Sequence, residues 1–187
     1  MLKYTIRADL LRYTGETASG KFLPSLLIPG FRYTFFLRKS HHYKKRSFLG
    51  LFYRIFLHID AHFYGFQIPP STQIGKGLYI GHWGTIVVNR KTIIGDFCNL
   101  SPGVTIGQTN RGKSKGVPTI GNKVWIGTNA VIVGNIIIGD NVMIAPNAFV
   151  NISVPSNSLV VGNPASILPR EDATEGYINY TIADTSL

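Results

Sequence analysis

The chain has 187 residues, of which 44% are hydrophobic and 15% charged, and 20 glycines are spread along it. This composition excludes a disordered or acidic protein and favours one turn-rich β domain with an appendage over two enzyme modules. Lysine and arginine outnumber aspartate and glutamate by 19 to 9, so the net charge is +10 and anionic partners are favoured: nucleic acid, an anionic membrane or phosphate-bearing small molecules.

The first 66 residues are rich in aromatic and basic side chains. The chain begins with MLKYTIRADLLRYTGE, which carries charges where a secretory signal has its apolar core. Proline and charged residues also interrupt the apolar windows 22–37 and 48–68, so neither predicts a membrane-spanning helix. Residues 48–66 are long enough and free enough of proline to be helical, and we expect an α-helical cap over 1–66.

The basic run RKSHHYKKR (38–46) has two interpretations. It forms either a solvated helix face or part of a basic, aromatic surface that rests on anionic lipid headgroups. The second interpretation predicts peripheral membrane contact through residues 20–66. No nucleic-acid recognition module accompanies the charge, so we expect no nucleic-acid partner.

From Ile68 onward, aliphatic residues recur every six positions. A period of six fits neither an α-helix nor a simple alternating strand. It is typical of short strands joined by tight corners, which stack in about five coils around an aliphatic column. The repeating residues are Ile68, Ile74, Ile80 and Ile86, then Val88, Ile94, Leu100 and Ile106, then Ile120, Ile126, Ile132, Ile138, Ile144 and Val150.

The period slips twice, by two residues between Ile86 and Val88 and again between Ile106 and Ile120. Slips in a solenoid mark residues that are extruded from a coil, and the second slip contains the polar, glycine-rich loop 107–118. Cys98, the single cysteine, lies inside the repeat. It excludes an intramolecular disulfide or cysteine-based zinc site, and we expect a buried, inert thiol in a reducing cytoplasm.

Four segments carry a resemblance to a known family: IGKGLYIGHWGTIVVN (74–89), residues 96–116, residues 118–150 and VVGNPASIL (160–168). They resemble the left-handed parallel β-helix acyltransferases, in the serine O-acetyltransferase branch. The resemblance implies a mainly β fold with a β-helix over 67–168 and a tail over 169–187. It also implies acetyl-CoA as co-substrate, no metal, and a homotrimer whose CoA groove lies between subunits.

Residues 51–68 look more like the capsule and exopolysaccharide enzymes of the branch, the colanic acid type. Where the serine enzymes carry an aspartate before the histidine, this chain has Gly81, and Gly116 and Val117 replace their arginine-histidine pair. Because an amino-acid acceptor needs charged partners, we expect transfer to a sugar hydroxyl in capsule, exopolysaccharide or related glycan synthesis, in the cytoplasm or at the inner face of the membrane. The alternatives are serine O-acetyltransferase of cysteine biosynthesis and a non-catalytic β-helix scaffold or polyanion-binding module.

The resemblance places His82 at the position of the family's catalytic base. An imidazole suits this role, since it can be neutral and basic near neutral pH. The alternative is a hydrogen-bonded structural histidine. Gln67 falls where the branch has a carboxylate that orients the histidine, and Asp60 is a second candidate for that role. Trp83, beside the base, either stacks on a sugar ring or packs over the first coil.

The remaining site residues also come from the resemblance. Gly107, Gln108 and Thr109 fall near the thioester, with the Gln108 amide as a donor to the oxyanion. Thr128 and Pro146 fall where small residues flank the pantetheine arm. Arg111, Lys113 and Lys115 meet phosphates or an acidic glycan, or are solvated loop charges.

Overall fold

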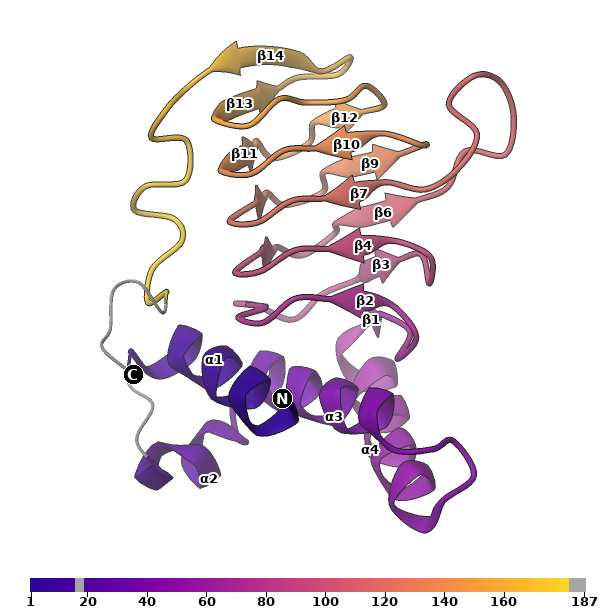
Figure 1. The fold of residues 1–187 in the computed structure, drawn as a ribbon, viewed down its shortest axis with the longest axis vertical. Helices are drawn as coiled ribbons and strands as arrows, with labels where there is room; N and C mark the ends of the chain where they lie inside the picture. Colours follow the sequence, from indigo (N-terminus) through magenta and orange to yellow (C-terminus); the bar gives the residue numbers. More distant parts are fainter. Residues whose placement is uncertain (16–18, 182–187) are drawn as a thin grey trace.

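Helices form one end of the molecule, and coils of β-strand are stacked on them (Figure 1). The structure is a computed structural model that describes residues 1–15 and 19–181, so positions 16–18 of the predicted cap and 182–187 of the predicted tail lie outside it. The helices are α1 (Leu2–Thr14), the 3-10 helix η1 (Ser19–Lys21), α2 (Phe22–Ser25), α3 (Pro29–His42) and α4 (Phe48–Tyr64).

Local signals fix both ends of α4, which leads directly into the β-helix. The Ser47 hydroxyl accepts a hydrogen bond from the Gly50 amide and caps the first turn. Gly65 ends the helix with a φ of 76°, a left-handed conformation that glycine adopts without a Cβ clash. Strand β1 begins at the next residue, Phe66, so the cap and the coils are joined without a linker.

The strands form three flat parallel faces. Sheet A has the order β1-β3-β6-β9-β12, sheet B has β2-β4-β7-β10, and sheet C has β5-β8-β11-β13 with β14 added antiparallel to β13. The strand bounds are β1 (Phe66–Gln67), β2 (Gln73–Ile74), β3 (Ile86–Val88), β4 (Ile93–Ile94), β5 (Asn99–Leu100), β6 (Thr105–Gly107), β7 (Thr119–Ile120), β8 (Trp125–Ile126), β9 (Val131–Val133), β10 (Ile137–Ile138), β11 (Val142–Ile144), β12 (Phe149–Val150), β13 (Ser158–Val161) and β14 (Ser166–Pro169). The predicted parallel β-helix with an N-terminal helical region is confirmed.

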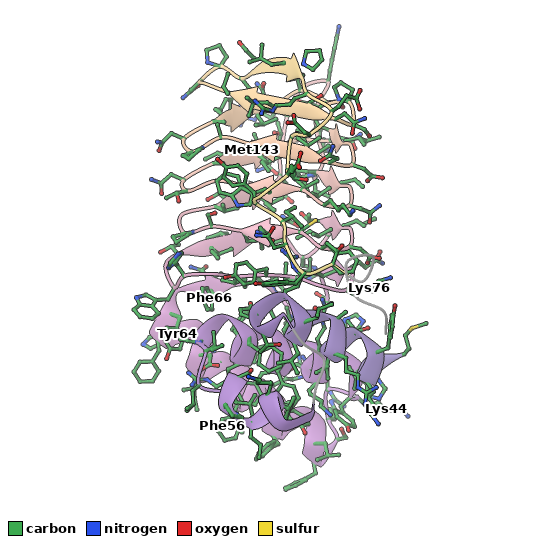
Figure 2. All side chains as sticks on the ribbon, turned by 90° about the vertical axis from the view of Figure 1, so that its left-hand side faces the viewer. Lys44, Phe56, Tyr64, Phe66, Lys76 and Met143 are labelled. Carbon is green, nitrogen blue, oxygen red and sulfur yellow. The ribbon has the colours of Figure 1, made fainter. Side chains whose placement is uncertain are left out.

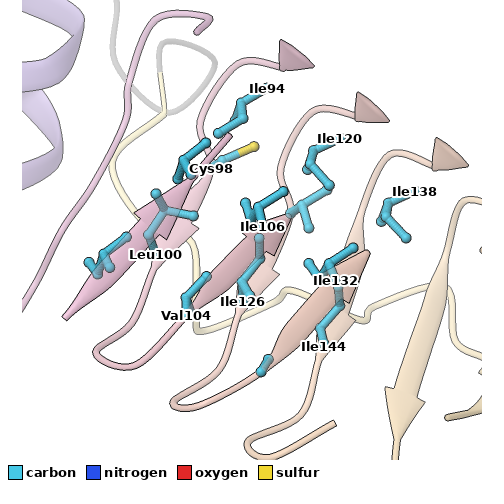
Figure 3. Close-up of a cluster of buried hydrophobic side chains, with 14 of the residues drawn as sticks. Ile94, Cys98, Leu100, Val104, Ile106, Ile120, Ile126, Ile132, Ile138 and Ile144 are labelled. Atoms are coloured by element: carbon cyan, nitrogen blue, oxygen red, sulfur yellow. The ribbon is translucent and has the colours of Figure 1, made fainter. Parts of the chain in front are cut away.

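The aliphatic residues of the period fill the inside of the coils as stacked columns (Figure 3). Sheet B contributes Ile94, Ile120 and Ile138, which are at most 2% exposed. Each such side chain contributes about 1.5–3 kcal/mol by leaving water. Cys98 lies in the same core and is fully buried, as its position in the repeat predicted.

The first coil has no coil beneath it, so its lower backbone groups need other partners. The buried pair Asp9–Arg38 meets part of this need: Asp9 Oδ1 accepts from the amides of Gly77 and Leu78, at 2.8 and 3.0 Å. Arg38 donates to Asp9 at 2.9 Å through Nε, and to two carbonyls of the same coil through its other nitrogens. One ion pair therefore ties α1, α3 and the first coil together.

Three more side chains of the helical cap bind backbone groups of the coils. Arg12 donates to the Gly77 carbonyl at 2.8 Å, and it also reaches the side chain of Asn99. The hydroxyl of Tyr13 accepts from the Ile80 amide at 2.9 Å, and the hydroxyl of Tyr33 contacts both backbone groups of Ile68. The lower edge of the first coil is thus hydrogen-bonded by helix side chains.

After β14 the chain returns along sheet C toward α1 (Figure 1). Tyr177 packs on Trp125 with ring centroids 5.0 Å apart, and its carbonyl accepts from the Asn99 side chain. The carbonyl of Asn179 then accepts from Arg12 at 2.8 Å. Within residues 1–15 and 19–181, no helix is long and apolar enough to cross a membrane.

The Asp9–Arg38 pair makes a direct prediction about stability. Replacing Arg38 with alanine leaves the buried Asp9 carboxylate unpaired, and we expect the free energy of unfolding to fall by about 3–5 kcal/mol. Arg170→Ala is the matched control, because its ion pair with Asp172 is more than half exposed, and it should cost no more than about 1 kcal/mol. Denaturant unfolding measures both; equal losses would contradict this role of the buried pair.

Cys98 makes a second prediction. Burial raises the pKa of the Cys98 thiol to about 12, so the reactive thiolate is scarce in the folded chain. At about pH 8 we expect iodoacetamide to leave the native protein unmodified and to alkylate it fully in denaturant. Mass spectrometry measures the extent of alkylation. Rapid labelling of the native protein would contradict the burial of the thiol.

Candidate active site

His82 lies on the corner that joins sheet C to sheet A in the first coil. Tyr79 pairs with Asn99 before this corner and Val87 pairs with Thr105 after it, so the first coil has two more residues here than the coil above. Gly84 packs directly under Pro102, and a Cβ on this glycine would lie 2.9 Å from the proline ring. The two additional residues are therefore His82 and Trp83, and the first slip of the period is located at them.

The additional residues protrude from the coil, whereas their aliphatic neighbours stay inside. His82 is exposed and Trp83 is 66% exposed, but Ile80 and Ile86 are fully buried. No hydrogen bond or ion pair holds the His82 imidazole within the described part of the chain, which gives no support to a structural role. Trp83 lies against Tyr64 at the end of α4, with ring centroids 6.2 Å apart.

The two candidates to orient His82 occupy different environments. Gln67 lies on β1 opposite Val87, with its side chain exposed on the outer face of sheet A. Asp60 is buried and accepts three hydrogen bonds from Arg32 at 3.0–3.2 Å. These bonds pair Asp60 with Arg32, and within the described residues none joins it to His82. No hydrogen bond joins Gln67 to His82 in the described residues.

Thr128 and Pro146 lie on the same edge of the β-helix as His82. The corner between sheets C and A stacks from coil to coil: the Asn129 amide donates to the Pro102 carbonyl at 2.9 Å, and the Asn147 amide donates to Thr128 at 2.8 Å. Successive corners therefore stack in a column above the protruding histidine.

Gly107, Gln108 and Thr109 lie at the base of the extruded loop, where sheet A leads into sheet B. Gly107 ends β6, and the backbones of Thr109 and Gly116 exchange two hydrogen bonds of 2.9 and 3.0 Å that close the loop. The Gln108 side chain accepts from Asn89 at 3.2 Å. The predicted loop 107–118 projects from the coils in Figure 1, and its charged residues Arg111, Lys113 and Lys115 are exposed.

A groove of about 750 Å³ separates α4 from the first coil. Gln67 lines it on one side, and Arg54, His58 and His62 line it from the helix. Arg54 Nε is buried without a hydrogen-bond partner in the described residues. No sequence motif marks Arg54, His58 and His62, and their spacing of four along one helix was the available signal.

The site residues fall into two groups that do not meet within one chain. His82, Thr128 and Pro146 lie at the beginning of the strands of sheet A, and the base of the loop lies at their end. Strands of three residues, at about 3.3 Å each, separate the two edges. The two groups therefore lie along opposite edges of sheet A.

The fold and the unrestrained histidine define a class of protein. Residues 118–151 match the family model described as bacterial transferase hexapeptide (six repeats). The serine acetyltransferase of Neisseria gonorrhoeae superposes with a TM-score of 0.73 and 30% identity, covering 91% of this chain and 66% of that protein. The soybean serine acetyltransferase apoenzyme gives a TM-score of 0.73 at 29% identity. The molecule is a left-handed β-helix acyltransferase.

Two sequence relatives identify the family within this class. The serine acetyltransferase of Helicobacter pylori strain ATCC 700392 / 26695 is 35% identical over 171 residues, which cover 91% of this chain and 99% of that protein. The serine acetyltransferase of Synechococcus elongatus is 36% identical over 169 residues, 89% of this chain and 68% of the relative. The chain belongs to the serine acetyltransferase family.

These relatives correct our predicted acceptor. The prediction of a sugar O-acetyltransferase of the capsule and colanic acid type is wrong, because relatives matching over nine-tenths of the chain are serine acetyltransferases. Without a sugar acceptor, there is no sugar ring on which Trp83 could stack. The chain lacks charged side chains at Gly81 and at positions 116–117, but the Arg54 guanidinium lies in the groove beside Gln67.

The corner at His82 makes a testable prediction about the fold. Deleting His82 and Trp83 together restores the spacing of the coil above, so we expect the free energy of unfolding to change by no more than about 1 kcal/mol. Deleting Pro102 and Gly103 instead shifts the buried Val104 and Ile106 out of register, which should cost more than about 3 kcal/mol. Chemical denaturation compares them, and similar losses would contradict the assigned extrusion.

Proposed function

We propose that the chain is a serine O-acetyltransferase that moves the acetyl group of acetyl-CoA to the hydroxyl of L-serine. The full-length relationship to serine acetyltransferases carries this proposal. The site supports it with an exposed, unrestrained imidazole at the edge of the β-helix. Cysteine biosynthesis, in which O-acetylserine is consumed, is then the process that the chain serves.

His82 is the general base in this mechanism. Its neutral imidazole removes the hydroxyl proton as the serine oxygen attacks the thioester carbonyl, and a tetrahedral intermediate forms. Donors at the base of the loop, with the Gln108 amide as our candidate, stabilise the oxyanion. The C–S bond then breaks, CoA leaves, and the imidazolium returns the proton to the thiolate sulfur.

Transfer is direct, without an acetyl-enzyme. Cys98 is the single cysteine of the chain, and it is fully buried in the core with its pKa raised to about 12. It therefore offers no nucleophile to the thioester. We assign the orientation of His82 during the reaction to Gln67, which is not hydrogen-bonded to it in this structure. In this role the Gln67 carbonyl would accept from the second ring nitrogen and fix the tautomer without adding charge.

The groove beside Gln67 supplies the charge that a serine acceptor needs. The amino acid brings a carboxylate, and Arg54, His58 and His62 line this groove without an acidic residue among its lining side chains. We assign the acceptor carboxylate to the Arg54 guanidinium in this groove, with His58 and His62 as hydrogen-bonding neighbours. Arg111, Lys113 and Lys115 on the loop are assigned to the phosphates of CoA, and Thr128 and Pro146 flank its pantetheine arm.

The active site is assigned to the interface of a homotrimer. The His82 corner of one subunit and the loop base of its neighbour supply the two groups of residues that one chain keeps apart. A closed ring of three subunits forms three such sites. We also propose that the helical end contacts membrane, and the next subsection gives the residues that carry this idea.

The proposal is tested by the release of CoA thiol from acetyl-CoA. We expect L-serine to increase the rate and O-acetylserine to form, and His82→Ala to lower kcat by about 10²–10⁴-fold. His42→Ala is the control, because His42 is equally an exposed histidine but lies at the end of α3. An unchanged rate with L-serine would remove serine as the acceptor, and an active His82→Ala variant would remove the base.

A further inference from the structure

The outer face of α4 carries large apolar side chains that remain between 39% and 83% exposed in the described part of the chain. Its inner face is anchored by Leu57, which joins the main core, and by the pair between Asp60 and Arg32. Phe48 and Phe63 are 83% and 77% exposed, at opposite ends of the helix. The other exposed apolar residues of α4 are Leu49, Leu51, Phe52, Ile55, Phe56 and Ile59.

A basic segment lies at the beginning of this face. Lys44, Lys45 and Arg46 precede α4 and are exposed, and no ion pair involves them in the part of the chain that the structure describes. Asp60 is the only acidic residue between Lys21 and Lys91, and Arg32 binds it. In Figure 2 both Phe56 and Lys44 lie on the helical end of the molecule, away from the coils and toward different sides of the view.

The charge pattern selects the occupant of this surface. A second copy of the chain would bring the same basic segment and no exposed carboxylate from residues 21–64, so like charges would meet around the contact. The headgroups of an anionic bilayer supply charge opposite to that of the basic segment, and the acyl chains accept the apolar face of α4. Phenylalanine-rich apolar faces with flanking lysine and arginine are typical of helices that lie in the membrane interface.

We propose that the outer face of α4 and residues 44–46 form a docking surface for an anionic lipid bilayer. The 17 residues of α4 span about 25 Å, so the helix can lie along the bilayer surface with its apolar side chains at the boundary of headgroups and acyl chains. The three basic residues contact lipid phosphates. In the proposed trimer three such surfaces act together, which raises the overall affinity.

Co-sedimentation with vesicles tests the surface directly. We expect the full chain to bind vesicles of phosphatidylcholine mixed with phosphatidylglycerol at about 0.05 M salt, to be released at about 0.5 M salt, and not to bind phosphatidylcholine alone. Reversing Lys44, Lys45 and Arg46 to glutamate should weaken binding by about tenfold or more. Reversing Arg111, Lys113 and Lys115 makes the same change in net charge elsewhere and should leave most of the binding.

The apolar contribution is tested with Phe48→Ser combined with Phe63→Ser. We expect about tenfold weaker binding, whereas Ile137→Ser, which alters a 64% exposed residue of sheet B, should bind as the parent does. The proposal is overturned if the chain does not bind anionic vesicles at low salt, or if both triple reversals weaken binding equally. It is also overturned if the double phenylalanine variant leaves vesicle binding intact but lowers the sedimentation coefficient of the free protein, because a second copy would then occupy the face. CoA release with serine is measured separately, so loss of docking and loss of the proposed activity are distinguishable.

Discussion

The lower edge of the first coil is the constraint on which the other features depend. Each upper coil hydrogen-bonds to the coil beneath it, but the first coil has only the helices to satisfy its buried backbone groups. Asp9, Arg12 and Arg38 meet this need from α1 and α3. Their hydrogen bonds fix the cap against the coil, and the placement of α4 beside the His82 corner follows from it.

The same arrangement explains why α4 has two different faces. One side packs toward α3 and the first coil, where Leu57 and Asp60 are buried, and the other side remains apolar and exposed. The groove with Arg54 and His58 lies between this helix and the first coil. One helix therefore contributes both to the walls of the candidate acceptor groove and to the surface assigned to the membrane.

Much of the β-helix could be predicted from the sequence because its period is local. Every sixth residue is aliphatic, and the slips of the period marked both the protruding corner and the loop 107–118. The period could not show which residues of the first slip are extruded, since Ile86 and Val88 both fit an inward position. The pairings on both sides of the corner, together with the contact of Gly84 with Pro102, assign the extrusion to His82 and Trp83.

The contacts of the cap could not be predicted, because they join residues far apart in the chain. Nothing near Asp9 indicates that its partners are Arg38 and the amides of Gly77 and Leu78. The choice of acceptor failed for a related reason. It relied on the side chains at a few matched positions, whereas a carboxylate can be met by cations from any element that reaches the site, including the partner subunit.

The central claim is that neither edge of sheet A is an active site alone, and that each site combines the His82 corner of one subunit with the loop of another. The direct measurement mixes two inactive variants: His82→Ala, and a chain in which an Asn-Gly turn replaces residues 110–115. After joint refolding at equal amounts, random assembly leaves both intact groups at about a quarter of the sites, so about a quarter of the parental CoA release should return. A mixture as inactive as its two components would contradict the account.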